Sequence, residues 1–381
     1  MAPLRVAIAT ESFLPEVNGV TNSVLRVLEH LDRAGHEALV IAPGPGADAY
    51  RGTRVVRVPS VRLPPVRSLP IGLPTRKVFT AIRDFRPDVV HLASPFVVGA
   101  AALTAARRLR LPTVAVFQTD LVGFARAYGL GVLTRYGWHR IRRLHRRADR
   151  TLAPSVSAVE SLLDQGVPRV HRWARGVDTV QFDPARRSET LRRELAPSGE
   201  LLVGYVGRLA PEKQVESLAA LNDLPGVRLA VVGAGPSERR LRALLPRAAF
   251  LGFRSGDDLA ATYASLDVFV HTGPFETFCQ AVQEALASGV PVVAPDAGGP
   301  RDLVTPGRTG YLYPVDSVDG LRAAVLALAD DDRRRRFGAA ARRSVLHRTW
   351  PVLCDELLAH YAAVLRHEAV MVPGPRVSTR T

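Results

Sequence analysis

An alternation of short apolar strands with helical segments runs along most of the chain. The first half predicts buried strands at residues 5–10, 37–42, 88–92 and 113–117, with an amphipathic helix at 20–34. Strands that alternate with helices form a parallel sheet, and the connecting helices cover both of its faces. The first half of the chain is therefore predicted to be a doubly wound α/β domain.

The same alternation starts again after a charged, proline-containing stretch. Further strands are predicted at 201–206, 228–232, 268–271 and 290–294, and helices near 212–224, 238–245 and 279–287. We therefore expect two Rossmann-like domains, residues 1–180 and 181–349, with the break between 177 and 199, and a frayed tail in 367–381. Two such domains leave a cleft, where ligands bind at the carboxyl ends of the strands.

Charge and composition exclude several classes of protein. The net charge is +15, which predicts an acidic partner, although only Lys77 and Lys213 among the 51 basic residues are lysine and such arginine use also fits a GC-rich genome. The two cysteines favour a reducing compartment, and the start of the chain shows no signal peptide. No apolar stretch reaches the roughly 20 residues that span a bilayer. We expect a cytoplasmic protein that can still bind a membrane surface.

Two segments concentrate the basic charge. Residues 49–83 contain eight basic side chains and no acidic one, and residues 135–150 contain seven arginines against one aspartate. Tyr136, Trp138, Ile141 and Leu144 interleave with the arginines of the second segment, which is typical of a basic amphipathic helix. Such a helix either binds anionic lipid headgroups or presents a solvated face.

Three loops that follow predicted strands carry candidate phosphate-binding residues. Gly19 lies in the turn between the first strand and helix, where a backbone can approach a phosphate closely. Arg208 follows strand 201–206, and Lys213 comes five residues later. Two cations beside a helix N-terminus would clamp a diphosphate, whereas a surface ion pair between Lys213 and Glu216 is the alternative. The turn at Gly233-x-Gly235 lies where it can shape a nucleotide pocket.

The segment 276–284 carries the strongest signal. Glu276 lies in a loop after a strand, and Glu284 lies eight residues later in a mostly apolar helix, roughly 12 Å away. That separation approaches the length of a sugar diphosphate, so one carboxylate would hold the sugar hydroxyls and the other the ribose. The amides of Phe278 and Cys279 would face the phosphates. The alternatives are a helix-capping Glu276 and a solvated Glu284.

Taken together, these segments resemble the family-4 retaining glycosyltransferases of the GT-B fold. The likeness covers about residues 4 to 365 and is closest to bacterial GDP-mannose-dependent α-mannosyltransferases that act on glycolipids; sulfoquinovosyl lipid transferases are also similar. It rests on the following segments, in the family's order: Asp88-x-x-His91, Arg175-Gly176-Val177-Asp178, Gly207-Arg208 to Lys213, Gly233-x-Gly235-Pro236, Glu276 to Glu284 and Gly298-Gly299.

The resemblance assigns roles to individual residues. Glu276 would contact the transferred sugar, with Asp120 as a second catalytic residue that stabilises charge. Asn18 and Gln118 would contact the sugar or the acceptor; many relatives have a histidine where this chain has Gln118, which cannot carry a proton at neutral pH. The donor-binding residues would be Gly19, Arg208, Lys213, Arg254, Glu276, Phe278, Cys279, Gln280 and Glu284. A final helix at about 350–366 would cross back to the first domain.

The resemblance implies mannosyl transfer from GDP-mannose to a membrane glycolipid, by a front-face mechanism that retains configuration and requires neither a metal nor another cofactor. The basic N-domain segments would hold the enzyme on the inner face of the cell membrane. A UDP-sugar donor, for glucosyl or sulfoquinovosyl transfer, is the main alternative, and a UDP-sugar epimerase of similar architecture is a weaker one. Nucleic acid is not an expected partner, because no reading module is visible and aromatic residues are only 6% of the chain.

Overall fold

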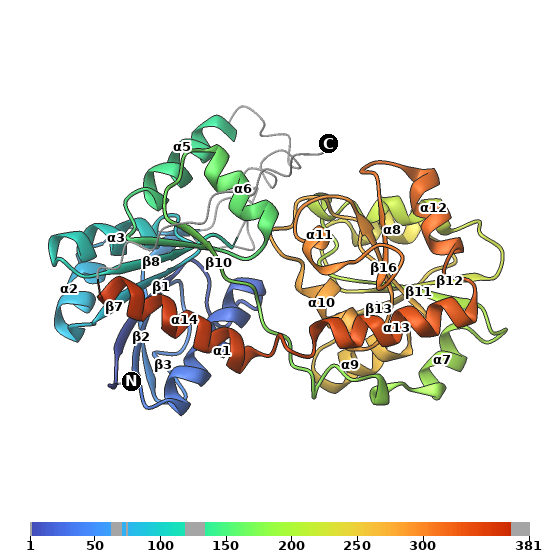
Figure 1. Cartoon of the computed structure of the whole chain (residues 1–381), viewed down its shortest axis with the longest axis horizontal. Helices are drawn as coiled ribbons and strands as arrows, with labels where there is room; N and C mark the ends of the chain where they lie inside the picture. The colour runs from blue at the N-terminus through green and yellow to red at the C-terminus, as the bar shows by residue number, and fades with distance from the viewer. Residues whose placement is uncertain (1, 62–70, 74, 119–133, 367–381) are drawn as a thin grey trace, which may run out of the picture.

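The computed structural model describes residues 2–61, 71–73, 75–118 and 134–366, which form two α/β domains (Figure 1). In the main sheet of the first domain, neighbouring strands run parallel to each other, except that β3 pairs with β4 in an antiparallel direction. Its strand order is β10 (Val170–Arg172), β9 (Arg150–Ala153), β8 (Thr113–Val116), β7 (Val89–Ala93), β1 (Arg5–Thr10), β2 (Glu37–Pro43), β4 (Thr53–Val58), β3 (Ala49–Tyr50). A small hairpin pairs β5 (Ser60–Val61) with β6 (Ile71–Gly72). The helices are α1 (Gly19–Arg33), α2 (Arg76–Phe85), α3 (Val98–Arg108), α5 (Thr134–His145) and α6 (Val156–Asp164).

The second domain repeats this plan with an all-parallel sheet of six strands. Its strand order is β13 (Ala249–Gly252), β12 (Val227–Val232), β11 (Leu201–Val206), β14 (Val268–Val270), β15 (Val292–Pro295), β16 (Gly310–Tyr313). The α-helices are α7 (Glu189–Leu195), α8 (Glu238–Leu244), α9 (Gly256–Ser265), α10 (Gln280–Ala287), α11 (Pro300–Leu303), α12 (Val318–Leu326) and α13 (Asp331–Val345). Three 3₁₀ segments are η3 (Pro184–Arg186), η4 (Pro211–Lys213) and η5 (Val215–Leu221). The expectation of two Rossmann-like domains is confirmed.

The last helix, α14 (Trp350–Leu365), crosses back and packs on the first domain (Figure 1). Its buried face includes Leu357 and Tyr361. The Tyr361 hydroxyl lies 2.5 Å from Nδ1 of His91 on β7, and the Trp173 indole donates a hydrogen bond to the Leu353 carbonyl at 2.7 Å. These contacts give hydrogen-bond partners to buried polar groups on α14 and on the first domain. They therefore fix the position of α14 on that domain. The expected return of the final helix is thus confirmed.

The helix predicted at residues 212–224 is wrong. The segment forms two 3₁₀ turns, η4 and η5, separated by Gln214, whose φ of 47° is left-handed. One α-helix cannot pass through a left-handed residue. The Thr272 hydroxyl also donates to the Lys213 carbonyl at 2.6 Å, which gives that carbonyl a partner outside a helix. The break turns Lys213 toward the end of β14.

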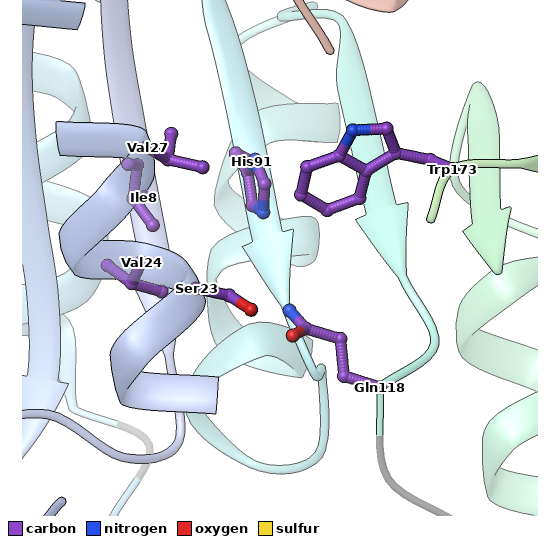
Figure 2. Close-up of a pocket in the computed structure, with 7 residues that line it drawn as sticks. All are labelled: Ile8, Ser23, Val24, Val27, His91, Gln118 and Trp173. Atoms are coloured by element: carbon purple, nitrogen blue, oxygen red, sulfur yellow. The ribbon is translucent and has the colours of Figure 1, made fainter. Parts of the chain in front are cut away.

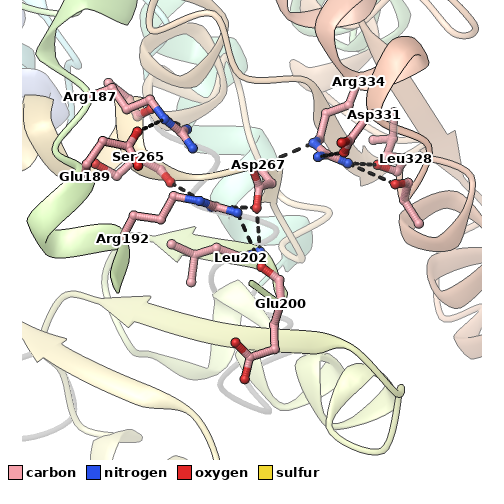
Figure 3. Close-up of polar contacts among 12 residues, drawn as sticks. Arg187, Glu189, Arg192, Glu200, Leu202, Ser265, Asp267, Leu328, Asp331 and Arg334 are labelled. Carbon is pink, nitrogen blue, oxygen red and sulfur yellow. Dashed lines mark hydrogen bonds and ion pairs between the residues drawn. The ribbon is translucent and has the colours of Figure 1, made fainter. Parts of the chain in front are cut away.

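Asp267, at the start of β14, joins three elements of the second domain (Figure 3). Its Oδ2 accepts a hydrogen bond from the Leu202 amide of β11 at 2.8 Å and forms an ion pair with Arg192 of α7 at 2.7 Å. Oδ1 lies 3.7 Å from Nε of Arg334 on α13. The residue is only 7% exposed, so its charge depends on these partners.

Candidate active site

Lys213 and Glu276 form an ion pair at the carboxyl edge of the second sheet. Lys213 ends η4, just after β11, and Glu276 lies in the loop between β14 and α10. Their side chains are 24% and 16% exposed, so the pair is shielded but still open to a ligand. Glu216, the alternative partner of Lys213, instead lies 3.9 Å from Arg240. The structure therefore directs the lysine toward Glu276.

Two further groups surround the Glu276 carboxylate. Nε2 of His271 lies 3.4 Å from it, and Cys279 is close to both. Burial alone would raise the pKa of Glu276, but the charge of Lys213 and the contact with His271 hold it well below its usual range. Burial alone would lower the pKa of His271, yet Cys279 and Glu276 raise it to about 10. Glu276 is therefore ionised at neutral pH and sits between two cations.

Glycines hold the Glu276 loop in place. A Cβ on Gly298 would lie 2.4 Å from the Glu276 carbonyl, and a Cβ on Gly299 would lie 2.3 Å from the Cα of Phe278. The Gly299 amide donates to the Glu276 carbonyl at 2.7 Å. Because only glycine allows this approach, the turn before α11 sets the position of the Glu276 backbone.

Arg175 joins the predicted donor and acceptor sides. Its guanidinium donates to the Gly19 carbonyl at 3.2 Å and to the Gln118 side chain at 2.9 Å. The Thr277 hydroxyl, next to Glu276, donates to the Gln118 carbonyl across the domain boundary at 2.9 Å. Burial lowers the pKa of Arg175 to about 10, with Glu276 opposing the shift, so the guanidinium stays charged at neutral pH. Gly19, Gln118 and Glu276 thus meet around one buried cation.

Gln118 also lines a narrow cavity inside the first domain. Figure 2 shows its side chain pointing toward Ser23 of α1 and His91 of β7, beside Trp173. Burial lowers the pKa of His91 to about 4. This histidine is therefore neutral at physiological pH and contacts α14 through Tyr361.

Three other predicted donor residues, Arg208, Arg254 and Gln280, each contact a neighbouring side chain or backbone carbonyl. Arg208 is half-buried and lies 3.6 Å from Glu212. Arg254, after β13, donates to the Thr262 hydroxyl on α9 at 2.8 Å. Gln280 donates to the Gly176 carbonyl of the first domain at 3.1 Å. Helix α10 begins at Gln280, one residue after the start of the helix predicted near 279–287, because Cys279 adopts a left-handed φ of 74°.

Asn18 has a structural role at the start of α1. Asn18 caps α1, since its Oδ1 accepts the amides of Val20 and Thr21 and its amide donates to Ser12. Asp120, predicted to stabilise charge, lies outside the described residues.

Sequence reasoning assigned no role to Arg175, His271 or Tyr263. Arg175 belongs to the segment Arg175-Gly176-Val177-Asp178, but the sequence does not distinguish a buried arginine from the many exposed ones. His271 could have been singled out from the sequence, because it is the polar last residue of the otherwise apolar strand predicted at 268–271.

The described residues contain no helix that is both long and apolar enough to cross a membrane.

Glu284 lies on α10 and is half-buried. Burial raises its pKa from 4.5 to about 7, although the Tyr263 hydroxyl donates to it at 3.1 Å and opposes the shift. A carboxyl whose folded pKa is raised destabilises the folded state as the pH climbs from its unfolded to its folded value. The destabilisation of the apo protein by Glu284 therefore grows from about pH 4.5 to about pH 7 and keeps its full size above that range.

We expect Glu284→Gln to raise the free energy of unfolding by about 2–3 kcal/mol at pH 8 and by under about 1 kcal/mol at pH 5. Urea unfolding of both proteins at the two pH values measures the difference. Glu189→Gln, at a side chain that is 68% exposed, is the matched control and should show no such pH dependence. An equal effect of Glu284→Gln at both pH values would contradict the raised pKa.

Comparisons with known proteins identify the family. Residues 17–181 match the model described as Glycosyltransferase Family 4, and residues 187–344 match Glycosyl transferases group 1. The chain is 58% identical over 371 residues to the GDP-mannose-dependent alpha-mannosyltransferase of Mycobacterium tuberculosis, covering 96% of this chain and 98% of the relative. It is 34% identical to the sulfoquinovosyl transferase SQD2 of Arabidopsis thaliana, covering 98% and 77%.

Solved structures agree on the fold. The Anabaena protein Alr3699/HepE, solved with UDP-glucose, superposes with a TM-score of 0.77 at 21% identity, covering 94% of this chain and all of that one. At such low identity the likeness concerns the two-domain fold alone. With the family matches on both domains and the extensive identity to the mycobacterial relative, the chain belongs to the family-4 glycosyltransferases and is an enzyme of the GT-B fold.

Proposed function

We propose that this enzyme transfers mannose from GDP-mannose to a membrane glycolipid, with retention of configuration and without a metal ion. The observation that carries the proposal is the meeting of the Lys213–Glu276 ion pair with Arg175, Gly19 and Gln118 at the junction of the two domains. The donor assignment is supported by the relative that is named a GDP-mannose-dependent enzyme and is 58% identical.

The charges of the site suit a leaving diphosphate. Lys213 is a half-buried cation and Arg175 a buried one, and α10 begins one residue after Cys279, close to Glu276. Cations and helix amides fixed before the reaction stabilise the charge that develops as the glycosidic bond breaks. Glu276, ionised and already aligned, would accept hydrogen bonds from sugar hydroxyls once Lys213 turns to the diphosphate. These residues supply the stabilisation for which other transferases use a divalent metal.

A front-face reaction also needs little from a protein base. The leaving phosphate oxygen takes the acceptor proton, and the protein holds the two substrates in line. Gln118 suits the role of positioning a substrate, because an amide can bind a hydroxyl without exchanging a proton. Glu284 would bind the ribose, and in that complex its hydrogen bond with Tyr263 would orient the carboxylate.

The acceptor side is proposed to face an anionic membrane through α5. The apolar face of this helix packs inside its own domain, since Ile141 and Leu144 are buried and Trp138 stacks on Phe117. The outer face presents Tyr136, which is 62% exposed, and a row of arginines. Membrane contact through α5 would therefore be electrostatic rather than by insertion of its apolar face.

We expect the triple substitution Arg135→Ala, Arg142→Ala and Arg143→Ala to weaken binding to anionic vesicles by roughly 100-fold. Each near-surface arginine contributes about 1 kcal/mol. Co-sedimentation with vesicles of phosphatidylglycerol and phosphatidylcholine at low salt measures the effect. The control removes three exposed arginines of the second domain, Arg239, Arg336 and Arg343. Equal losses from both triple variants would show that net charge alone drives binding.

The test of the function is transfer of labelled mannose from GDP-mannose into solvent-extractable lipid, with purified enzyme, a bacterial lipid extract and EDTA. Labelled lipid would support GDP-mannose as the donor, a lipid as the acceptor and a reaction that needs no metal ion. Label that appears only without EDTA would overturn metal independence. Label in soluble sugar acceptors but not in lipid would overturn the acceptor.

A UDP-sugar donor is the second candidate. It is motivated by the 34% identity to a sulfoquinovosyl transferase over nearly the whole chain. The same assay with UDP-glucose and UDP-sulfoquinovose in place of GDP-mannose separates the two: activity with a UDP-sugar alone would replace the mannosyl assignment.

A further inference from the structure

Three potential metal ligands converge beside the Lys213–Glu276 ion pair. One ring nitrogen of His271, one carboxylate oxygen of Glu276 and the Cys279 sulfur all lie within 4.8 Å of one another. An imidazole, a carboxylate and a thiolate form a ligand set that zinc and related divalent ions prefer. Small rotations of these side chains would bring all three within bonding distance of one ion.

The imidazole of His271 is buried and only partly hydrogen-bonded. The side chain is 98% buried, and its Nε2 faces the Gly273 carbonyl at 3.0 Å and Glu276 at 3.4 Å. Nδ1 has no hydrogen-bond partner among the described residues. Buried ring nitrogens are normally paired, because an unpaired one loses its hydrogen bond to water. Nε2 is the ring nitrogen that faces Glu276 and would bind an ion held there.

The thiol is held in the same place by an unusual backbone. Cys279 has a φ of 74° and a ψ of 79°, a conformation that favours glycine, and it is 5% exposed. The conformation places the residue at the start of α10, beside His271 and Glu276. The sulfur is free, because the only other cysteine, Cys354, lies in α14 and neither forms a disulfide.

We propose that His271, Glu276 and Cys279 form an inhibitory binding site for a zinc-like divalent ion. The ion would bind the imidazole of His271, the thiolate of Cys279 and one oxygen of Glu276, and the imidazolium and the thiol would each release a proton to solvent. Lys213 now occupies that carboxylate, so the ion and the ammonium compete for it. Binding of the ion would separate Lys213 from Glu276 and prevent both residues from binding the sugar donor. This regulation is distinct from the proposed reaction, for which no metal is needed.

The test uses the full-length protein and Co²⁺ as a spectroscopic substitute for Zn²⁺. Wild-type protein is expected to develop a cobalt–thiolate charge-transfer band that Zn²⁺ abolishes, and Cys279→Ala to lose the band completely. Cys354→Ala is the matched control and should keep it. Absence of the band in the wild type, or its persistence in Cys279→Ala, would overturn the proposal.

Lys213→Met gives the sharper test, because it removes the competing cation and frees Glu276. Zinc affinity, measured by competition with a chromophoric chelator, should increase by roughly tenfold or more. An unchanged or weaker affinity would refute the competition. Binding is measured without substrate, so these outcomes do not depend on the proposed mannosyl transfer; inhibition of transfer by Zn²⁺, reversed by EDTA, is the separate functional readout.

Alkylation of the wild-type protein covers the case in which Cys279→Ala fails to fold. Zn²⁺ should slow the labelling of Cys279 by iodoacetamide, followed by peptide mass spectrometry, and leave the rate at Cys354 unchanged. Equal rates at Cys279 with and without Zn²⁺ would overturn the site.

Discussion

Glu276→Gln is expected to lower the rate of glycosyl transfer by roughly 100- to 1000-fold. Glutamine keeps the size of the side chain but removes the charge that aligns Lys213 and accepts sugar hydroxyls. The loss should appear mainly in kcat, because a charge that stabilises the transition state more than the bound donor acts on the chemical step. Lys213→Met should give a loss of similar size, and the double variant should be little worse than either, because the two residues act as one unit.

Glu216→Gln is the matched control for this prediction. Glu216 belongs to η5, three residues after Lys213, but its charge lies near Arg240 and not near the lysine. Its replacement should leave transfer unchanged. Circular dichroism and the unfolding midpoint must show that Glu276→Gln stays folded. A folded Glu276→Gln enzyme with wild-type activity would refute the site.

Asp267→Ala is expected to lower the free energy of unfolding by about 3 kcal/mol. The substitution leaves the Leu202 amide without its acceptor and leaves Arg192 and Arg334 without a common anion (Figure 3). Removing one partner from a buried ion pair costs more than the pair contributes, because the remaining charges lose both water and counter-ion. Urea unfolding of the purified variant, followed by circular dichroism, measures the change.

The matched control uses another partner of Arg334. Asp331 forms an ion pair with the same guanidinium, but its side chain is 65% exposed. Solvent-exposed pairs contribute little, so Asp331→Ala should change the free energy of unfolding by less than about 1 kcal/mol. If both substitutions had equal effects, burial would not be what makes Asp267 important.

Local sequence pattern was a good guide to the central strands. The predictions at 5–10 and 201–206 match β1 and β11 at both ends, since a short apolar run between polar loops favours a buried strand. Short strands away from the sheet centre, such as β13 and β16, were not predicted. Both lie at the edges of their sheet and are less buried than β8 and β15, which also have four residues and were predicted, so pairing with neighbours decides their conformation.

The 3₁₀ turns at 211–221 show that the spacing of apolar residues did not distinguish an α-helix from shorter helical turns. Apolar residues there recur as in a helix, and they are buried as that pattern predicts. The left-handed Gln214 and the Thr272 contact to the Lys213 carbonyl depend on a segment 59 residues away. No window of local sequence contains that information.

The sequence alone determined the fold class, the two repeated α/β halves and the segments after strands from which the site is built, because these depend on periodicities and loop positions within short stretches. Tertiary structure decided which groups interact. It placed Lys213 on Glu276 instead of Glu216, buried Arg175 between Gly19 and Gln118, and brought His271 to Cys279. Charge and hydrogen bonding depend on distance and burial in three dimensions, and a linear order of residues specifies neither.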